Sequence, residues 1–196
     1  MKGRLLFRRS AVALAFALPP DGVTARGSPP PSSPGAAIHQ AGDAAAVRAL
    51  IAQVPATRDF PPDFAATLHA EAPAFVVEMT TAPGCAPCAD LWSRLQLLHT
   101  QYGLRIATLS RQEALLRSGR LGLPWVGHPV AWVRAAADPN RVIPIAIGTD
   151  HNANLARNIY LAFKMMTGVR PAVAVRGMAR FTGIVGASPI TPSRRK

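Results

Sequence analysis

The only two cysteines of the chain, Cys85 and Cys88, stand three positions apart between a short apolar run and a segment with helical periodicity. The apolar run at 74–79, AFVVEM, lies between a proline and a Thr-Thr-Ala-Pro-Gly turn, a pattern typical of a buried strand. From Ala86 to Gln101 the large apolar residues recur on one helical face: they are Leu91, Trp92, Leu95 and Leu98. We therefore expect a strand–turn–helix unit, with Cys85 at the N-terminus of the helix.

The position of the two cysteines limits the chemistry that they can perform. Orphan N–H groups and the dipole at a helix N-terminus favour negative charge, so we expect the thiolate of Cys85 to be stabilised. Cys88 falls one turn further along, more shielded and close enough to form a disulfide with Cys85. This arrangement favours a redox couple in which Cys85 attacks and Cys88 resolves the mixed disulfide. A static disulfide and a metal site stay open as alternatives, although zinc would need a second cysteine pair or paired histidines.

The remaining periodicities predict an α/β domain with a central mixed sheet. The elements expected after the first strand and helix are a strand at 104–110, a helix at 111–119, a helical insertion around 130–137, a helix from Asp150 or Asn152 to Thr167, and a β-hairpin of 172–175 with 181–186. Gly103 and Gly168 are expected to end the two longer helices. The three tryptophans, Trp92, Trp125 and Trp132, are expected in the core.

The first 25 residues have the pattern of a cleaved signal peptide. Four basic residues precede an apolar run from Ala11 to Leu18, and Val23-Thr24-Ala25 fits the small-x-small cleavage pattern. The run is too short to span a bilayer as a helix. An uncleaved anchor and an over-extended start of translation are the alternatives. Export would place the mature chain in the periplasm, where disulfides are permitted.

The rest of the chain divides by composition. Residues 26–42 form a Pro/Ser/Gly-rich linker, and 43–72 a helical N-terminal extension in which Asp43 is expected to cap the first helix. Residues 73–187 form the α/β domain, and 188–196 a basic tail. No other segment is long and apolar enough to be transmembrane, so the mature chain is expected to lack a membrane span.

The formal charge of +12 raises the question of nucleic-acid binding. The basic residues are scattered singly along the chain, and only its two ends carry clusters. Zinc-finger spacing, an RNP-like aromatic motif and a basic helix are all missing from the sequence. We therefore expect no specific nucleic-acid partner, while a basic surface suits acidic partners or anionic membranes.

Two stretches of the sequence are similar to a known family. EMTTAPGCAPC, followed by an amphipathic helix, resembles the active site of the thioredoxin superfamily, and TGVRPAVAVRGMARFTGIVG resembles its second signature. This resemblance implies that Pro171 is a cis-proline that faces the cysteines and opens an edge for the substrate backbone. The long interval between Cys88 and Pro171 resembles the periplasmic DsbC/DsbG-type disulfide isomerase branch. That branch implies a thioredoxin-like fold with a helical insertion between the second strand and the C-terminal β-hairpin.

The resemblance also assigns roles to residues around the pair. Ala86 and Pro87, between the cysteines, and Arg170, before the expected cis-proline, would contact the substrate. A cation at Arg170 would favour the Cys85 thiolate and acidic substrates, unless it points to solvent. Glu78 would help proton transfer from Cys88, the alternatives being an exposed or a salt-bridged glutamate.

These observations predict an exported thiol–disulfide oxidoreductase or isomerase, with the direction of electron flow left open. Its partners would be envelope proteins with thiols or disulfides and a redox partner, and it would need no cofactor and no metal. The alternative is a non-enzymatic thioredoxin-like accessory protein of a conjugative transfer or secretion assembly.

Overall fold

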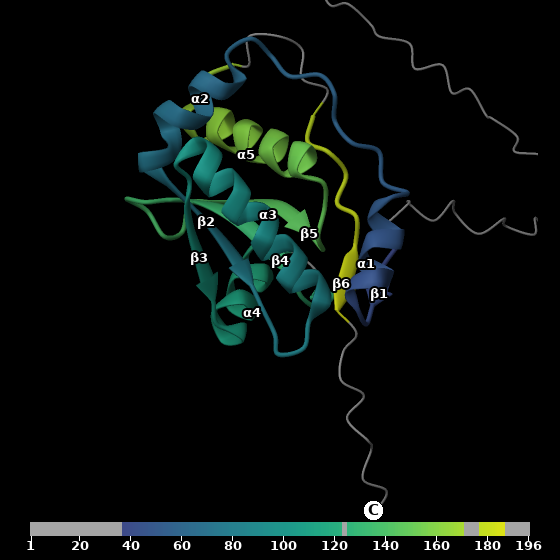
Figure 1. The fold of residues 1–196 in the computed structure, drawn as a ribbon. Coiled ribbons are helices and arrows are strands. Elements are labelled where there is room, and N and C mark those ends of the chain that lie inside the picture. Colours follow the sequence, from purple (N-terminus) through teal and green to yellow (C-terminus); the bar gives the residue numbers. More distant parts are fainter. Residues whose placement is uncertain (1–36, 123–124, 171–176, 187–196) are drawn as a thin grey trace, which may run out of the picture. The chain divides into compact units, whose positions relative to one another are not determined.

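The protein is described by a computed structural model that covers residues 37–122, 125–170 and 177–186. These residues form a mixed α/β structure with two sheets, one of four strands and one of two (Figure 1). The elements are β1 His39–Ala41, α1 Ala44–Ile51, α2 Phe64–Glu71, a 3-10 turn at Ala72–Ala74, β2 Phe75–Thr80, α3 Ala86–Tyr102, β3 Arg105–Leu109, α4 Arg111–Arg120, β4 Val130–Ala135, β5 Val142–Ile147, α5 Asn152–Thr167 and β6 Ile184–Gly186.

The larger sheet has the strand order β3-β2-β4-β5. Strands β2 and β3 are parallel and are connected by α3, whereas β4 runs antiparallel to both β2 and β5. Pro144 can lie within β5 because this strand is at the edge of the sheet, where a missing N–H leaves no ladder bond unmade. The two ends of α3 follow the prediction, since it begins at Ala86 and ends at Gly103, which has a φ of 73°.

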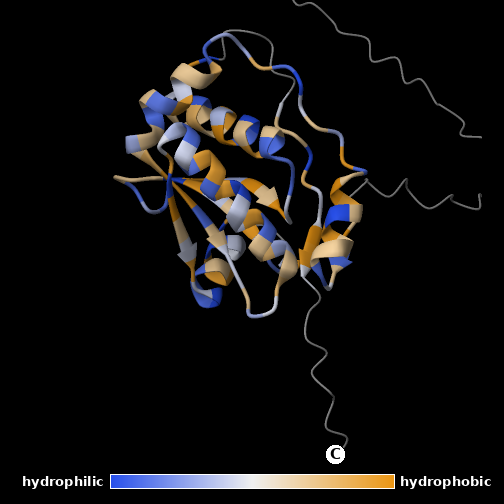
Figure 2. Ribbon diagram, in the orientation of Figure 1, coloured by the Kyte–Doolittle hydropathy of each residue, from blue (hydrophilic) through white to orange (hydrophobic). Residues whose placement is uncertain are grey.

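The two faces of this sheet carry different cores. Helices α2, α3 and α5 cover one face, on which Phe75, Val77 and Met79 of β2 contribute to the main core. Helix α4 covers the other face, where Ala114 packs with Val130 and Trp132. In Figure 2 apolar and hydrophilic stretches alternate along α3 and α5, as expected of helices that rest one face on a sheet. Alternate residues of β2 therefore point to opposite cores.

The prediction of a helix around 130–137 is wrong, because this segment forms strand β4 and continues into the β4–β5 hairpin. Strand β4 is central, paired with β2 on one side and β5 on the other. Its residues Trp132 and Val133 are both fully buried, one on each face. A strand buried on both faces has no alternation of polar and apolar residues, so VAWVRA cannot be told from a buried helix by periodicity. The sheet thus contains a hairpin where a helical insertion was expected.

The C-terminal strand pairs with the N-terminal part of the chain. Strand β6 lies parallel to β1, a segment that the sequence assigned to the linker. Ile184 packs with Val47 and Ile51 of α1 in a small core of its own. The other half of the expected hairpin, 172–175, lies outside the described residues. This small β1–α1–β6 unit contacts the start of α3 through Ala86.

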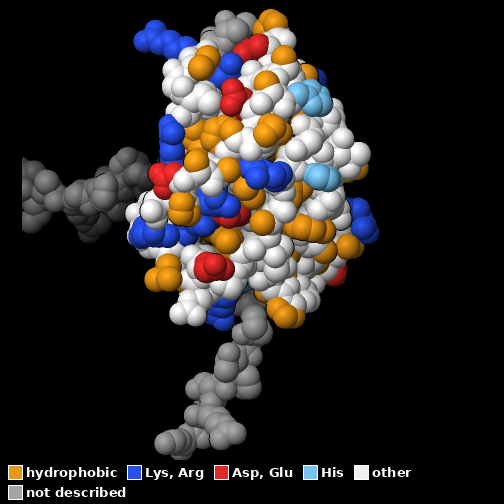
Figure 3. All heavy atoms as spheres, turned by 90° about the vertical axis from the view of Figure 1, so that its left-hand side faces the viewer, with side chains coloured by type: hydrophobic (Ala, Val, Ile, Leu, Met, Phe, Trp, Pro, Cys, Tyr) orange, Lys and Arg blue, Asp and Glu red, His pale blue; other side chains and the backbone are white. Residues whose placement is uncertain are grey.

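The two helices of the N-terminal extension form as predicted, and Asp43 caps the first, its Oδ1 accepting from the Ala46 N–H at 2.8 Å. Among the helices that the structure describes, none has both the length and the apolar character needed to cross a membrane. On the face shown in Figure 3, Lys and Arg side chains are spread among hydrophobic and acidic ones. The expected signal peptide at 1–25 and basic tail at 188–196 lie outside the described residues.

Candidate thiol–disulfide site

The two cysteines are joined in a disulfide at the start of α3, with their Cα atoms 5.2 Å apart. Cys85 is the N-cap residue of the helix and is partly exposed. Cys88 lies one turn further in, is only 2% exposed and belongs to the main core with Met79 and Leu91. The structure therefore separates the pair into an accessible sulfur and a buried one.

A backbone N–H at the helix start is directed at the accessible sulfur. The Cys88 N–H points to Cys85 Sγ at 3.2 Å, so the Cys85 side chain takes the place of an N-cap oxygen. Pro87 fits this first turn because an N–H at its position would have no helical partner. When the disulfide is reduced, this N–H and the positive end of the α3 dipole stabilise charge on Cys85 Sγ.

A loop residue before β4 completes the surroundings of Cys85. The carbonyl oxygen of His128 lies 3.8 Å from Cys85 Sγ, and the His128–Pro129 peptide bond is cis. Sequence reasoning missed this segment; the residue that it expected in a cis bond, Pro171, lies outside the described residues. The signal was Gly127-His128-Pro129, a Gly/Pro pair directly before an apolar run, which marks a loop that enters a strand.

The end of β6 lies against the disulfide. The Gly186 N–H donates to the His128 carbonyl at 2.7 Å, and a Cβ on Gly186 would lie 3.0 Å from Cys85 Sγ. A contact this short is tighter than nearly all real Cβ contacts. Glycine at 186 therefore leaves β6 close to Cys85 without a side chain between them.

Replacing Gly186 by valine is expected to slow reduction of the Cys85–Cys88 disulfide by a small dithiol about tenfold, because the new side chain covers Cys85 Sγ. The measurement is the rate of disulfide reduction under excess dithiothreitol. Gly42→Val is the matched control, since no atom lies within 4 Å of a Cβ built at Gly42. Equal rates in the two variants would show that β6 does not limit access to the sulfur.

A groove of about 410 Å³ opens on the α3 side of the disulfide. Both cysteines line it, together with Met79, Thr108 and Trp92. Trp92, which was expected in the core, is 38% exposed, whereas Trp132 is buried as predicted. Trp92 thus provides an exposed apolar surface in the groove that contains Cys85. Of the two residues between the cysteines, Ala86 lines this groove and Pro87 is buried.

Glu78 lies on the opposite face of the sheet from Cys88, so the predicted role in proton transfer is not supported. Its neighbours Val77 and Met79 point to the core that contains Cys88, and Glu78 alternates away from them. Glu78 is 5% exposed, and its carboxylate accepts from Arg117 Nη1 and, at 2.6 Å, from Arg134 Nε. Glu78 is therefore the salt-bridged glutamate that the sequence left as an alternative.

Arg170 is exposed beyond the C-terminal end of α5, away from the pair. That end of the helix lies beside the β4–β5 turn, because Arg141 donates to the Met166 carbonyl. The opposite end lies beside α3, where the Thr149 hydroxyl donates to Asp90 at 2.5 Å. The structure therefore does not bring Arg170 to Cys85.

Burial lowers the pKa of the His128 imidazole from its ordinary value of 6.5, and the positive charge of Arg111 lowers it further. The ring packs edge-on against Trp125, with centroids 5.0 Å apart. A histidine with a lowered pKa binds fewer protons in the folded chain than in the unfolded chain. The free energy of unfolding therefore falls as the pH drops through the pKa that the histidine has in the unfolded chain.

We expect the free energy of unfolding to decrease less in His128→Gln than in the wild type when the pH is lowered from about 7.5 to about 5.5. Urea titrations of wild type and variant across this range measure the effect. His39→Gln is the control, since His39 is exposed. A slope that His128→Gln leaves unchanged would exclude His128 as its source.

Comparisons of the chain with protein-family models, with curated proteins and with solved structures find no match. The described residues also contain no group of three or more His, Cys, Asp and Glu side chains that could hold a metal ion.

Proposed function

We propose that this protein is a thiol–disulfide oxidoreductase that acts on proteins through Cys85 and Cys88. The observation that carries the proposal is the asymmetry of the pair: Cys85 Sγ is accessible and faces the Cys88 N–H, while Cys88 is buried. A static disulfide does not need an accessible sulfur at a helix N-terminus beside an exposed tryptophan.

A thioredoxin-like fold is part of this proposal. It is supported by the order β2–α3–β3–α4–β4–β5–α5, by the change from parallel to antiparallel pairing, and by the cysteines at the start of α3. Pro129, in a cis bond beside Cys85, fits the role that the family resemblance had given to Pro171. The proposed fold differs from the expected isomerase branch in lacking the helical insertion at 130–137.

The exchange has two balanced steps. A substrate thiolate attacks Cys85 Sγ, the Cys85–Cys88 bond breaks, and the bonding pair leaves with Cys88 as a thiolate that takes up a proton. A second substrate thiolate then attacks the substrate sulfur of the mixed disulfide and releases Cys85 as a thiolate. The substrate is thereby oxidised to a disulfide and the protein reduced to a dithiol; the reverse sequence reduces a substrate. Such chemistry suits an oxidising compartment such as the periplasm, the location that the sequence predicts.

The test is the reduction potential of the pair, measured by equilibration with glutathione. A potential of roughly −120 to −200 mV would identify an oxidase or isomerase, and one near or below roughly −270 mV a reductant. A disulfide that resists even excess strong dithiol would contradict the proposal and indicate a structural disulfide.

A further inference from the structure

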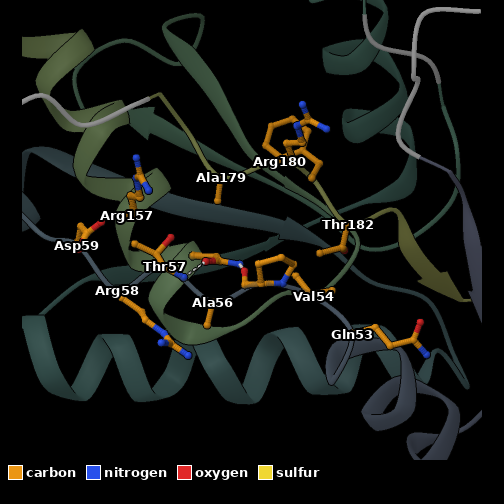
Figure 4. A pocket seen from close by; sticks show the side chains of 13 residues that line it. Gln53, Val54, Ala56, Thr57, Arg58, Asp59, Arg157, Ala179, Arg180 and Thr182 are labelled. Atoms are coloured by element: carbon orange, nitrogen blue, oxygen red, sulfur yellow. Dashed lines mark hydrogen bonds between the residues drawn. The ribbon is translucent and has the colours of Figure 1, made fainter.

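A second cavity, of about 630 Å³, lies at the side of α5 (Figure 4). Its walls are the segment 53–59, which follows α1, and the segment 179–182, which precedes β6. Asn154 and Arg157 of α5 line it between these walls. It lies within the size range of pockets that bind small molecules.

Two buried asparagines of α5 fix both walls of this cavity. Asn154 Oδ1 accepts from the Thr57 N–H at 2.7 Å, and its Nδ2 donates to the Pro55 carbonyl at 3.0 Å. Asn158 Oδ1 accepts from the Ala179 N–H at 2.7 Å, and its Nδ2 donates to the Ile145 carbonyl. Because both amides are buried and satisfied, the cavity is formed before any ligand binds.

The charges around the cavity are unbalanced. Arg58, Arg157 and Arg180 line it with a single acid, Asp59, so three positive charges and one negative give a net charge of +2. The side chains of these three arginines make no hydrogen bond or ion pair with another described residue. The Arg157 Nε is buried and without a hydrogen-bond partner among the described residues. A buried charged donor that lacks an acceptor is costly, and an anion would satisfy it.

The view in Figure 4 separates the roles of the arginines. Arg157 lies beside Asp59 on one side of the cavity, Arg180 extends from the 179–182 segment on the other, and Arg58 points away from both. Arg157, whose buried Nε has no partner among the described residues, is therefore the first candidate for direct contact with a ligand. Arg180, on the other wall of the cavity, is the second. Val54, Pro55 and Phe181 supply apolar surface between the charged groups.

We infer that this cavity binds a small molecule with a doubly charged oxyanion, such as a phosphate monoester, attached to an apolar or aromatic body. The net charge of +2 matches a phosphate monoester at neutral pH, and a guanidinium fork fits phosphate oxygens in a bidentate manner. The apolar lining takes the body of the ligand. This site is separate from the disulfide and does not depend on the proposed redox function.

Isothermal titration of the full chain with phenyl phosphate, inorganic phosphate and phenol tests the inference. Phenyl phosphate is expected to bind with one site per chain, inorganic phosphate more weakly, and phenol not at all. Arg157→Gln should weaken phenyl phosphate binding about tenfold or more, since it removes a charge-assisted hydrogen bond. Arg180→Gln should weaken it as well. Arg48→Gln, at an exposed arginine of α1, is the matched control and should leave the affinity unchanged.

Three results would overturn the inference. The first is that neither phenyl phosphate nor inorganic phosphate binds saturably, and the second is that Arg48→Gln loses as much affinity as Arg157→Gln. The third is that anionic phospholipid vesicles bind in a manner that depends on Arg157 while phenyl phosphate does not bind. The second would indicate a diffuse effect of net charge, and the third a membrane surface. Thermal unfolding in chloride buffer checks that Arg157→Gln is folded. If Arg157→Gln does not fold, the affinity of Arg180→Gln tests the inference by itself, because Arg180 is exposed and its replacement leaves the fold intact.

Discussion

Cys85→Ser is expected to lower thiol–disulfide exchange activity about a thousandfold or more, because it removes the sulfur that forms the mixed disulfide with the substrate in either direction of exchange. Only Cys85 Sγ is partly exposed and faces the Cys88 N–H, so buried Cys88 cannot take over its role. The measurement is the rate of exchange with a peptide disulfide that carries a fluorophore and its quencher. Ser93→Ala is the control, since this exposed hydroxyl of α3 donates to the Ala89 carbonyl within its own helix.

The complementary variant separates the two sulfurs. Cys88→Ser keeps the attacking thiol and removes the resolving one, so the mixed disulfide between Cys85 and the peptide should accumulate as a stable covalent adduct. Cys85→Ser should form no such adduct. If Cys85→Ser retained full exchange activity, or if adducts formed equally in both variants, the proposed roles would be wrong.

Local features of the sequence predicted the parts of this site that depend on neighbouring residues. The apolar run before the cysteines, the helical face after them and the glycine cap at Gly103 are all short-range signals, and strand β2 and helix α3 lie where they indicate. Helix α5 with its cap at Gly168 followed in the same way. These local signals predict the elements correctly because the tertiary contacts favour the same helices and strands.

What the sequence could not indicate depends on contacts between distant segments. His128 and Gly186 reach Cys85 only because β4 pairs with β2 and β6 pairs with β1. The sequence of a three-residue strand such as β1 does not indicate that β6, near the other end of the chain, is its parallel partner. Glu78 shows a related limit: a shift of one residue along a strand moves a side chain to the other face of the sheet, and Glu78 points away from Cys88 to Arg117 and Arg134. Met79, its neighbour, is the residue that faces Cys88.

Glu78→Gln is expected to destabilise the fold by roughly 3–5 kcal/mol, the largest stability effect that the structure predicts, because breaking a buried ion pair leaves its partner charge uncompensated. The side chain of Arg117 is only 9% exposed, and its Nε already lacks a partner among the described residues. The Arg117 guanidinium also lies over the Trp132 ring, 5.6 Å from its centroid. Arg134 depends less than Arg117 on the Glu78 carboxylate, since its side chain is 20% exposed and also donates to the Ala135 carbonyl.

Urea unfolding with the disulfide intact in every sample measures the effect, with the slope compared to detect changes in the unfolded state. Glu113→Gln is the matched control: this exposed glutamate caps α4 together with Ser110, and an amide can still accept there, so a loss of about 1 kcal/mol or less is expected.

A double variant then distinguishes an ion pair from a packing effect. Glu78→Leu with Arg117→Met removes the two most buried charges of the cluster, leaves the more exposed Arg134, and keeps apolar volume between β2 and α4. Replacement of a buried ion pair by apolar residues is often neutral or stabilising. The double variant should therefore recover most of the stability that Glu78→Gln loses. Equal destabilisation by the single and the double variant would mean that the shape of the Glu78 side chain matters more than its charge. Because Glu78 and Cys88 lie on opposite faces of the sheet, Glu78→Gln should also leave the reduction potential of the disulfide unchanged, and a shifted potential would restore the role in proton transfer.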